Sequence, residues 1–182
     1  MNTNQESIDQ CGGCGLVVPN GTTGCQSIMD ELLARHFSDV TYFGVHRLFV
    51  DTYCLQHPDR YCASFKSLAA HLAHLCWSLE HQGSRAIPSE AIRHWVERHP
   101  HLEKPLLPTR RGVLTVADVA RAADPSAHHR AVHEWARATW EAYVDLQSAG
   151  RHWVKLALEG AQVEGTRAPG RTDRGPGGRR VV

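Results

Sequence analysis

The sequence lacks a long hydrophobic run, since no stretch of about 18 consecutive apolar residues occurs in the chain. Residues 1–10 are polar and lack the basic start and apolar stretch of a signal peptide. An excess of charge of one sign is also missing, because 20 lysines and arginines stand against 19 aspartates and glutamates. We therefore expect a cytoplasmic protein that does not span a membrane and is not a dedicated nucleic-acid-binding protein.

Several catalytic and nucleotide-binding motifs are absent too: a phosphate-cradling glycine loop, a serine elbow and a dinucleotide fingerprint. The chain is instead rich in potential metal ligands, with six cysteines and 13 histidines. In a reducing cytosol, cysteines are more naturally metal ligands, buried thiols or redox groups than disulfides. The composition therefore makes metal binding a candidate function.

A chain of 182 residues fits one domain with a disposable tail. We expect a flexible N-terminus over residues 1–10, a single helical domain over 11–159 with a zinc knuckle at 11–25, and a disordered basic tail over 160–182. The tail holds five arginines against two acidic residues and almost no apolar residue. It therefore cannot offset the entropy lost on ordering.

Apolar residues recur at steps of three and four along most of the chain, which is the period of an α-helix. The predicted fold class is all-α: a small helical bundle with an N-terminal Gly/Cys zinc knuckle and a long C-terminal helix. The knuckle is too rich in glycine for a helix or a regular strand. Short connections between the first three helices favour an antiparallel arrangement. The helices are expected at residues 25–37, 42–57, 64–81, 89–98, 114–124 and from 126 past 150.

Three cysteines near the N-terminus are candidate ligands of a zinc ion. Cys11 and Cys14 flank two glycines, which supply the backbone freedom to fold two thiolates around one metal ion. Cys25 falls at the expected start of a helix, where the helix dipole favours a thiolate. Together they predict three sulfur ligands for zinc.

The fourth ligand follows from the antiparallel arrangement, which returns the end of the second helix to the beginning of the first. His57 is our choice, with Cys54 and Cys62 as substitutes. A closed tetrahedral set of this kind is structural. Two alternatives stay open: a redox pair at Cys11 and Cys14, and unliganded thiols.

A second constellation lies between the second and third helices, where His71 is expected at the level of Asp51 and His74 at that of His46. One interpretation is a catalytic metal or an acid–base pair made from His46, Asp51 and His71. The other is a buried hydrogen bond between Asp51 and His71 that fixes helix register, with His46 and His74 at the surface. Buried polar groups need partners whether or not they do chemistry, which favours the second.

These motifs together resemble an uncharacterised bacterial family known only as a domain of unknown function, of the DUF5946 type. The likeness covers roughly residues 10 to 155 and includes Cys11-Gly-Gly-Cys-Gly and Cys25. Its most distinctive piece is His46, Val50, Asp51, Tyr53, Gln56, His57 and Pro58. The resemblance implies no mechanism, but it places the candidate histidines and Asp51 inside a recognised pattern.

Two functions are therefore expected. The first is a zinc-stabilised helical protein that acts as a binding or regulatory module. The alternative is a metal-dependent enzyme, a hydrolase or transferase similar in outline to the DinB-like helical bundles, with a His/Asp site between the second and third helices. The sequence identifies no substrate, partner or oligomeric state.

Overall fold

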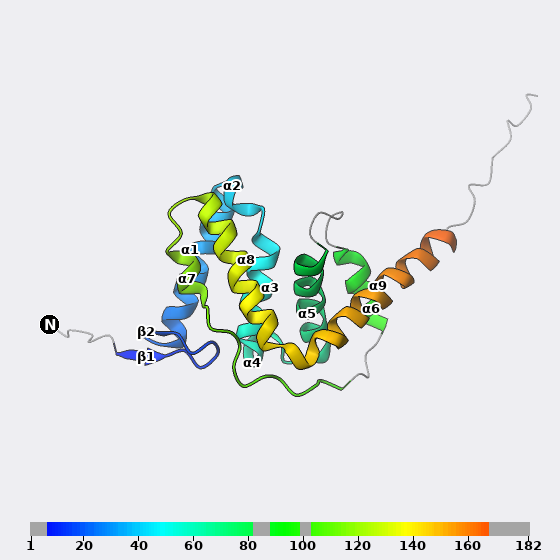
Figure 1. Cartoon of the computed structure of the whole chain (residues 1–182), viewed down its shortest axis with the longest axis horizontal. Helices are drawn as coiled ribbons and strands as arrows, with labels where there is room; N and C mark the ends of the chain where they lie inside the picture. Colours follow the sequence, from blue (N-terminus) through cyan, green and yellow to red (C-terminus); the bar gives the residue numbers. More distant parts are fainter. Residues whose placement is uncertain (1–6, 82–87, 99–102, 168–182) are drawn as a thin grey trace, which may run out of the picture.

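The computed structural model describes residues 7–81, 88–98 and 103–167, and the fold is mainly helical, which confirms the predicted fold class (Figure 1). A two-stranded sheet of β1 (Ile8–Gln10) and β2 (Val17–Pro19) precedes the helices. The helices span Thr22–Ser38 (α1), Val40–Phe43 (α2), His46–Gln56 (α3), Pro58–Tyr61 (α4), Phe65–Glu80 (α5), Ser89–Arg98 (α6), Val116–Ala120 (α7), Pro125–Ala142 (α8) and Gln147–Arg167 (α9), with a 3-10 turn at Val144–Leu146 (η1).

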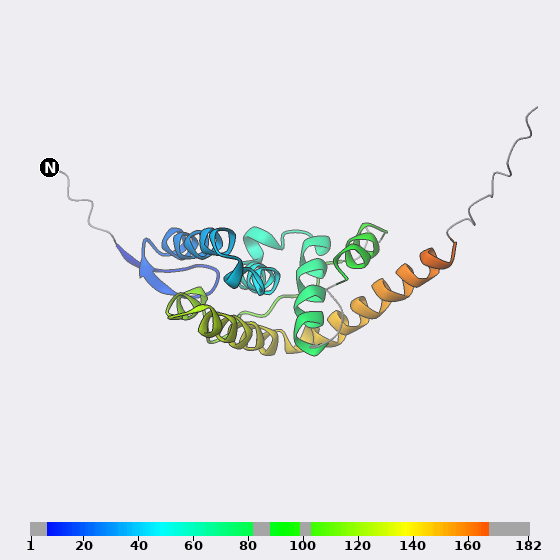
Figure 2. The same cartoon turned by 90° about the horizontal axis from the view of Figure 1, so that it is seen from above.

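Helices α3 and α5 lie in the middle of the molecule. α3 packs against α5 and α8, whereas α5 also packs against α6 and α9. The hairpin, α1 and α7 occupy one end, and α9 runs past α6 at the other end, where its last turns project away from the body (Figures 1 and 2). No helix of the described part of the chain is long and apolar enough to cross a membrane.

The helix expected at residues 42–57 is wrong in its boundaries, because two helices, α2 and α3, cover this region. Asp39 starts α2 by accepting a hydrogen bond from the backbone N–H of Thr41 at 2.9 Å. Gly44 follows α2, and a Cβ added there would lie 3.1 Å from Cε1 of His129 on α8. The chain therefore bends where α8 approaches closely.

The long C-terminal helical pattern is interrupted as well. α8 ends at Ala142, and α9 begins after the 3-10 turn. The buried hydroxyl of Tyr143, the residue after α8, donates to the backbone oxygen of Leu55 at 2.6 Å. α9 then continues to Arg167, through residues that we expected in the tail. Residues 168–182 of that tail and residues 1–6 of the expected flexible N-terminus lie outside the described residues, whereas residues 8–10 form β1.

A single buried amide joins three segments of the fold. Gln56, the last residue of α3, donates through Nε2 to the backbone oxygens of Arg111 and Leu114, at 2.7 and 2.8 Å. Its Oε1 accepts a hydrogen bond from Nε1–H of Trp135 on α8 at 2.9 Å. Both side chains are fully buried, so these groups have no access to water. Gln56 thus holds the segment before α7 and α8 against the end of α3.

We expect Gln56→Leu to lower the free energy of unfolding by about 2–5 kcal/mol, because it leaves the buried Nε1–H of Trp135 and the backbone oxygens of Arg111 and Leu114 without this partner. Urea unfolding followed by far-ultraviolet circular dichroism measures the change. In the Gln56→Leu background, Trp135→Phe should cost less than in the wild type, since the lost partner is shared. Additive costs in the double mutant would contradict this coupling.

Candidate metal centre

The first two candidate ligands lie in the loop of the N-terminal hairpin. β1 pairs with β2 in antiparallel register, with Gln10 opposite Val17. In the loop, the N–H of Cys11 donates to the oxygen of Leu16 at 2.8 Å, and that of Gly15 donates to the oxygen of Cys11 at 2.9 Å. Gly15 has a φ of 80°, a left-handed conformation that glycine adopts cheaply. The segment that we expected to contain no strand is therefore the turn and second strand of a hairpin.

The third cysteine, Cys25, lies in the first turn of α1 and is fully buried. Its backbone N–H donates to the oxygen of Gly21 at 3.0 Å. The N-terminal end of a helix carries partial positive charge, which favours a thiolate there. α1 thus presents Cys25 to the hairpin loop, and the Sγ atoms of Cys14 and Cys25 are 3.7 Å apart.

His57 follows α3 directly, and Pro58 starts α4 beyond it. Its Nδ1 lies 2.8 Å from the backbone oxygen of Tyr53. A carbonyl oxygen can only accept, so Nδ1 carries the hydrogen and Nε2 keeps its lone pair. That Nε2 lies 3.4 Å from Sγ of Cys11 and 3.5 Å from Sγ of Cys25. A hydrogen bond on the far nitrogen is the usual way in which proteins orient a histidine ligand.

The four donor atoms of Cys11, Cys14, Cys25 and His57 all lie within 4.8 Å of one another. For zinc bonds of about 2.3 Å to sulfur and about 2.0 Å to nitrogen, a regular tetrahedron has edges of roughly 3.5–3.8 Å. The contacts of 3.4–3.7 Å between these atoms are close to those edges. The cluster could therefore hold a metal ion.

The electrostatics of the cluster show why a cation suits it. A hydrogen bond from the Cys25 thiol lowers the pKa of Cys14, and the same bond, together with burial, raises the pKa of Cys25. Burial opposes ionisation of Cys11, but hydrogen bonds from the backbone of Cys14 and Gly13 outweigh it and lower its pKa. Burial lowers the pKa of His57, but bonds to Cys14 and to the Tyr53 carbonyl outweigh it and raise that pKa. Negative charge thus collects in a buried space, and a metal ion would neutralise it.

Gly13 allows the imidazole to approach the loop. A Cβ added at Gly13 would lie 2.2 Å from Cδ2 of His57. Nη1 of Arg111 donates to the oxygen of Gly13 at 3.0 Å and so fixes the loop from the other side. By contrast, a Cβ at Gly12 would meet only Oγ1 of Thr22, at 3.8 Å.

The substitute ligands lie outside the cluster. Sγ of Cys62 donates to the backbone oxygen of Cys54 at 3.5 Å. Burial raises the pKa of both thiols to about 12, so both stay protonated at neutral pH. All six cysteines are free of disulfides.

Asp51 and His71 meet between α3 and α5. Nδ1 of His71 donates to Oδ1 of Asp51 at 2.7 Å, and Nε of Arg47 donates to Oδ2 at 2.8 Å. The Asp51 side chain is fully buried, so this carboxylate is held by two donors away from water. The expectation that His74 lies at the surface is wrong, because it is buried beside Arg47.

His46 belongs to a different cluster from the other two catalytic candidates. Its Nδ1 lies 3.2 Å from Nδ1 of His36 on α1, and Nε2 of His36 lies 2.7 Å from Nε2 of His128 on α8. The three rings form a chain across α1, α3 and α8. The contact between His36 and His128 was not predicted from the sequence, because 92 residues separate them and no local spacing links them.

The fold and the site together define a helical protein whose N-terminal hairpin carries a cluster of three cysteines and one histidine able to hold a metal ion. The model of a protein family, the family of unknown function DUF5946, matches residues 9–144. The chain belongs to that family. The resemblance found in the sequence is thereby confirmed. No curated protein and no solved structure matches the chain.

We expect Gly13→Ala to weaken metal binding by at least tenfold, because the added methyl group overlaps the His57 ring and displaces a ligand. Competition with a fluorescent chelator measures the affinity. Gly12→Ala is the matched control and should bind as the wild type does, since its methyl group makes an ordinary contact. Equal affinities of both variants would contradict the role of Gly13.

The histidine chain predicts acid sensitivity. Burial, followed by repulsion from neighbouring cationic groups, lowers the pKa of His36 and of His128 to about 4, from 6.5. Because the folded pKa is the lower one, the unfolded chain binds protons first as the pH falls. The free energy of unfolding is therefore unaffected by these two histidines above pH 6.5. Between pH 6.5 and 4 it falls by up to about 1.4 kcal/mol per pH unit for each histidine.

Urea unfolding near pH 7.5 and near pH 5 tests this. His36→Gln should lose less stability between the two pH values than the wild type, because one buried titrating ring is gone. His152→Gln, on the exposed surface of α9, should lose as much as the wild type. Acid release of a metal is common to all three proteins and cancels in the comparison. An unchanged pH dependence in His36→Gln would refute the explanation.

Proposed function

We propose that Cys11, Cys14, Cys25 and His57 bind one structural zinc ion. The donor set supports zinc, because thiolate and imidazole ligands suit this metal, whereas calcium and magnesium require oxygen ligands. Four protein ligands complete a tetrahedron and leave no position open for a substrate. The chemistry supplied by the ion is therefore attachment of chain segments rather than catalysis.

The observation that carries this proposal is the weak packing of the hairpin. Five of the six residues of β1 and β2 are exposed, so the strands bury little apolar surface. An isolated two-stranded hairpin is marginally stable at best. Cys11 in its loop is nevertheless 1% exposed, and its Sγ lies beside the ring of His57, 46 residues along the chain. Ligand bonds there would fasten the hairpin to α1 and to the end of α3.

At the level of the whole chain, we propose a binding or regulatory module that this zinc stabilises. The metal-dependent enzyme of the alternative interpretation needs His46, Asp51 and His71 around one ion. Asp51 and His71 pair with each other, but His46 contacts His36 instead. Within residues 7–81, 88–98 and 103–167, the cysteine cluster is the one group of three or more potential ligands at metal-binding distance. The geometry favours a role for Asp51 and His71 in fixing helix register.

Elemental mass spectrometry on protein purified without added metal tests the proposal. We expect one zinc per chain in the wild type and a loss of nearly all of it in Cys14→Ser, because a serine hydroxyl stays protonated and binds zinc poorly. Cys76→Ser is the matched control, since Cys76 is buried on α5 outside the cluster, and it should keep its zinc. A wild type without zinc, or equal zinc in both variants, would refute the site.

The structural role has its own readout. Removal of zinc with a chelator should speed hydrogen exchange in the hairpin, residues 8–19, more than in α5. Readdition of zinc should restore protection. Exchange that is unchanged in the hairpin would mean that the ion, though bound, does not fasten it.

A further inference from the structure

One side of the hairpin loop borders a cavity. Of the six cysteines of the chain, Cys14 alone is not buried. A cavity of about 270 Å³ lies against the same loop, and its lining includes Gly12, Gly13 and the candidate ligand His57. Water and small solutes can therefore approach the loop that carries Cys14, whereas burial shields the other five cysteines.

Cys14 also lies beside a second sulfur atom. Its Sγ is 3.7 Å from Sγ of Cys25, which belongs to a different element, α1. A disulfide has an S–S bond of about 2.0 Å, so the two atoms need to approach by roughly 1.7 Å. Cys14 has a glycine on each side in the chain, and a loop of this kind can make such a shift while α1 stays in place.

The third sulfur atom of the cluster has other neighbours. Backbone N–H groups of Gly13 and Cys14 donate to Cys11, and its Sγ lies 3.4 Å from Nε2 of His57. Cys11 is also 1% exposed. The geometry therefore favours a bond between Cys14 and Cys25 over the redox pair of Cys11 and Cys14 that the sequence left open.

We propose that hydrogen peroxide converts Cys14 and Cys25 into a disulfide and thereby releases the metal ion, which makes the cluster a redox-sensitive attachment. This inference rests on the zinc site proposed above. The Cys14 thiolate attacks one oxygen of the peroxide, which forms an S–O bond, breaks the O–O bond and releases hydroxide. The Cys25 thiolate then attacks Sγ of Cys14, which forms the S–S bond, breaks the S–O bond and releases a second hydroxide. The two sulfur atoms lose two electrons, and the peroxide gains both.

The disulfide changes which segments of the chain are joined. Cys11 and His57 remain as ligands, and two protein ligands are too few for a structural zinc site, which has four. The loop stays attached to α1 through the new bond, but its attachment to His57, after the end of α3, is lost. Because the strands bury little apolar surface, the hairpin should then move more freely relative to α3.

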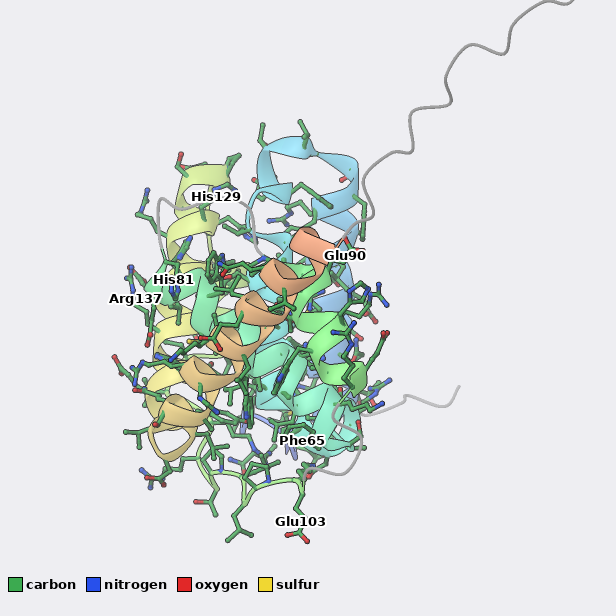
Figure 3. All side chains as sticks on the ribbon, turned by 90° about the vertical axis from the view of Figure 1, so that its right-hand side faces the viewer. Phe65, His81, Glu90, Glu103, His129 and Arg137 are labelled. Carbon is green, nitrogen blue, oxygen red and sulfur yellow. The ribbon has the colours of Figure 1, made fainter. Side chains whose placement is uncertain are left out.

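The remaining cysteines supply internal controls. Cys54, Cys62 and Cys76 are buried in the helical body, and Cys76 lies on α5, which begins at Phe65 (Figure 3). These three thiols lie outside the cluster. An oxidant that acts at Cys14 leaves them reduced while the chain stays folded.

The test begins with a measurement of bound zinc, so that failure of the site and failure of the switch are separate results. Hydrogen peroxide is then added in slight excess, a zinc-responsive dye follows release, and free thiols are alkylated. Thermolysin cleaves near Leu16 and separates Cys14 from Cys25 unless a disulfide joins them. We expect one zinc released for each disulfide, with the alkyl group located on Cys11 by tandem mass spectrometry.

The Cys76→Ser variant should release zinc as the wild type does. A phosphine reductant and added zinc should restore the bound ion, and hydrogen exchange in residues 8–19 should rise on oxidation and return on reduction. Absence of zinc at the outset would refute the site and the inference with it. Zinc retained in excess peroxide would overturn the inference alone. So would zinc loss that leaves Cys14 as a sulfinic acid or joins it to Cys11.

Discussion

The convergence of three sulfur atoms and one imidazole nitrogen at the loop of the N-terminal hairpin is the constraint that organises this end of the molecule. Three separate segments reach that point: the hairpin loop, the first turn of α1 and the residue after α3. Hydrophobic burial does not explain the meeting, because the strands are mostly exposed and the atoms that meet are polarisable and ionisable. Thiolates this close repel one another unless a proton or a cation lies between them. A metal ion relieves that repulsion for all of them at once, whereas a shared proton serves only one pair.

Helix α3 connects this site with the rest of the interior. Together with the next residue, His57, it supplies polar partners to α1, α5 and α8. Asp51 faces α5 and pairs with His71, Gln56 holds α8 through Trp135, and His57 faces the cysteines. Each of these groups is buried, so each needs its partner to avoid the cost of an unsatisfied polar group. Such contacts fix the rotation and register of α3, because a helix turned by a third would leave several of them unpaired at once.

Most of the buried polar groups around α3 have hydrogen-bond partners within the fold, but one of them does not. Gln56 and Asp51 form hydrogen bonds with other residues of the fold, and both therefore have a structural role. His74 differs, because Arg47 donates to its Nδ1 and so places the ring hydrogen on Nε2. This N–H has no hydrogen-bond partner among the described residues. Arg47 therefore contacts two buried groups at once, because it pairs with the carboxylate of Asp51 and donates to His74.

Local features of the chain were readable from the sequence alone. Helical periodicity and the glycines around Cys11 and Cys14 act over a few residues, and each has a direct local cause. The antiparallel return of α3 was enough to nominate His57, although it could not separate His57 from Cys54 and Cys62. That choice rests on backbone direction at the end of α3, where the Tyr53 carbonyl turns the ring toward the thiols.

Tertiary structure alone decided where the remaining histidines lie. His46 meets His36 and His128 because α8, far along the chain, packs against α3, and His74 is buried because α5 approaches Arg47. The breaks at Gly44 and Tyr143 likewise arise from contacts with distant segments, which override helix propensity. A sequence reports the period of each element, but the rotation of one element against another depends on side-chain packing over the whole core. Those rotations placed two of the three histidines of α3 and α5, His46 and His74, beside partners that their spacing had not indicated.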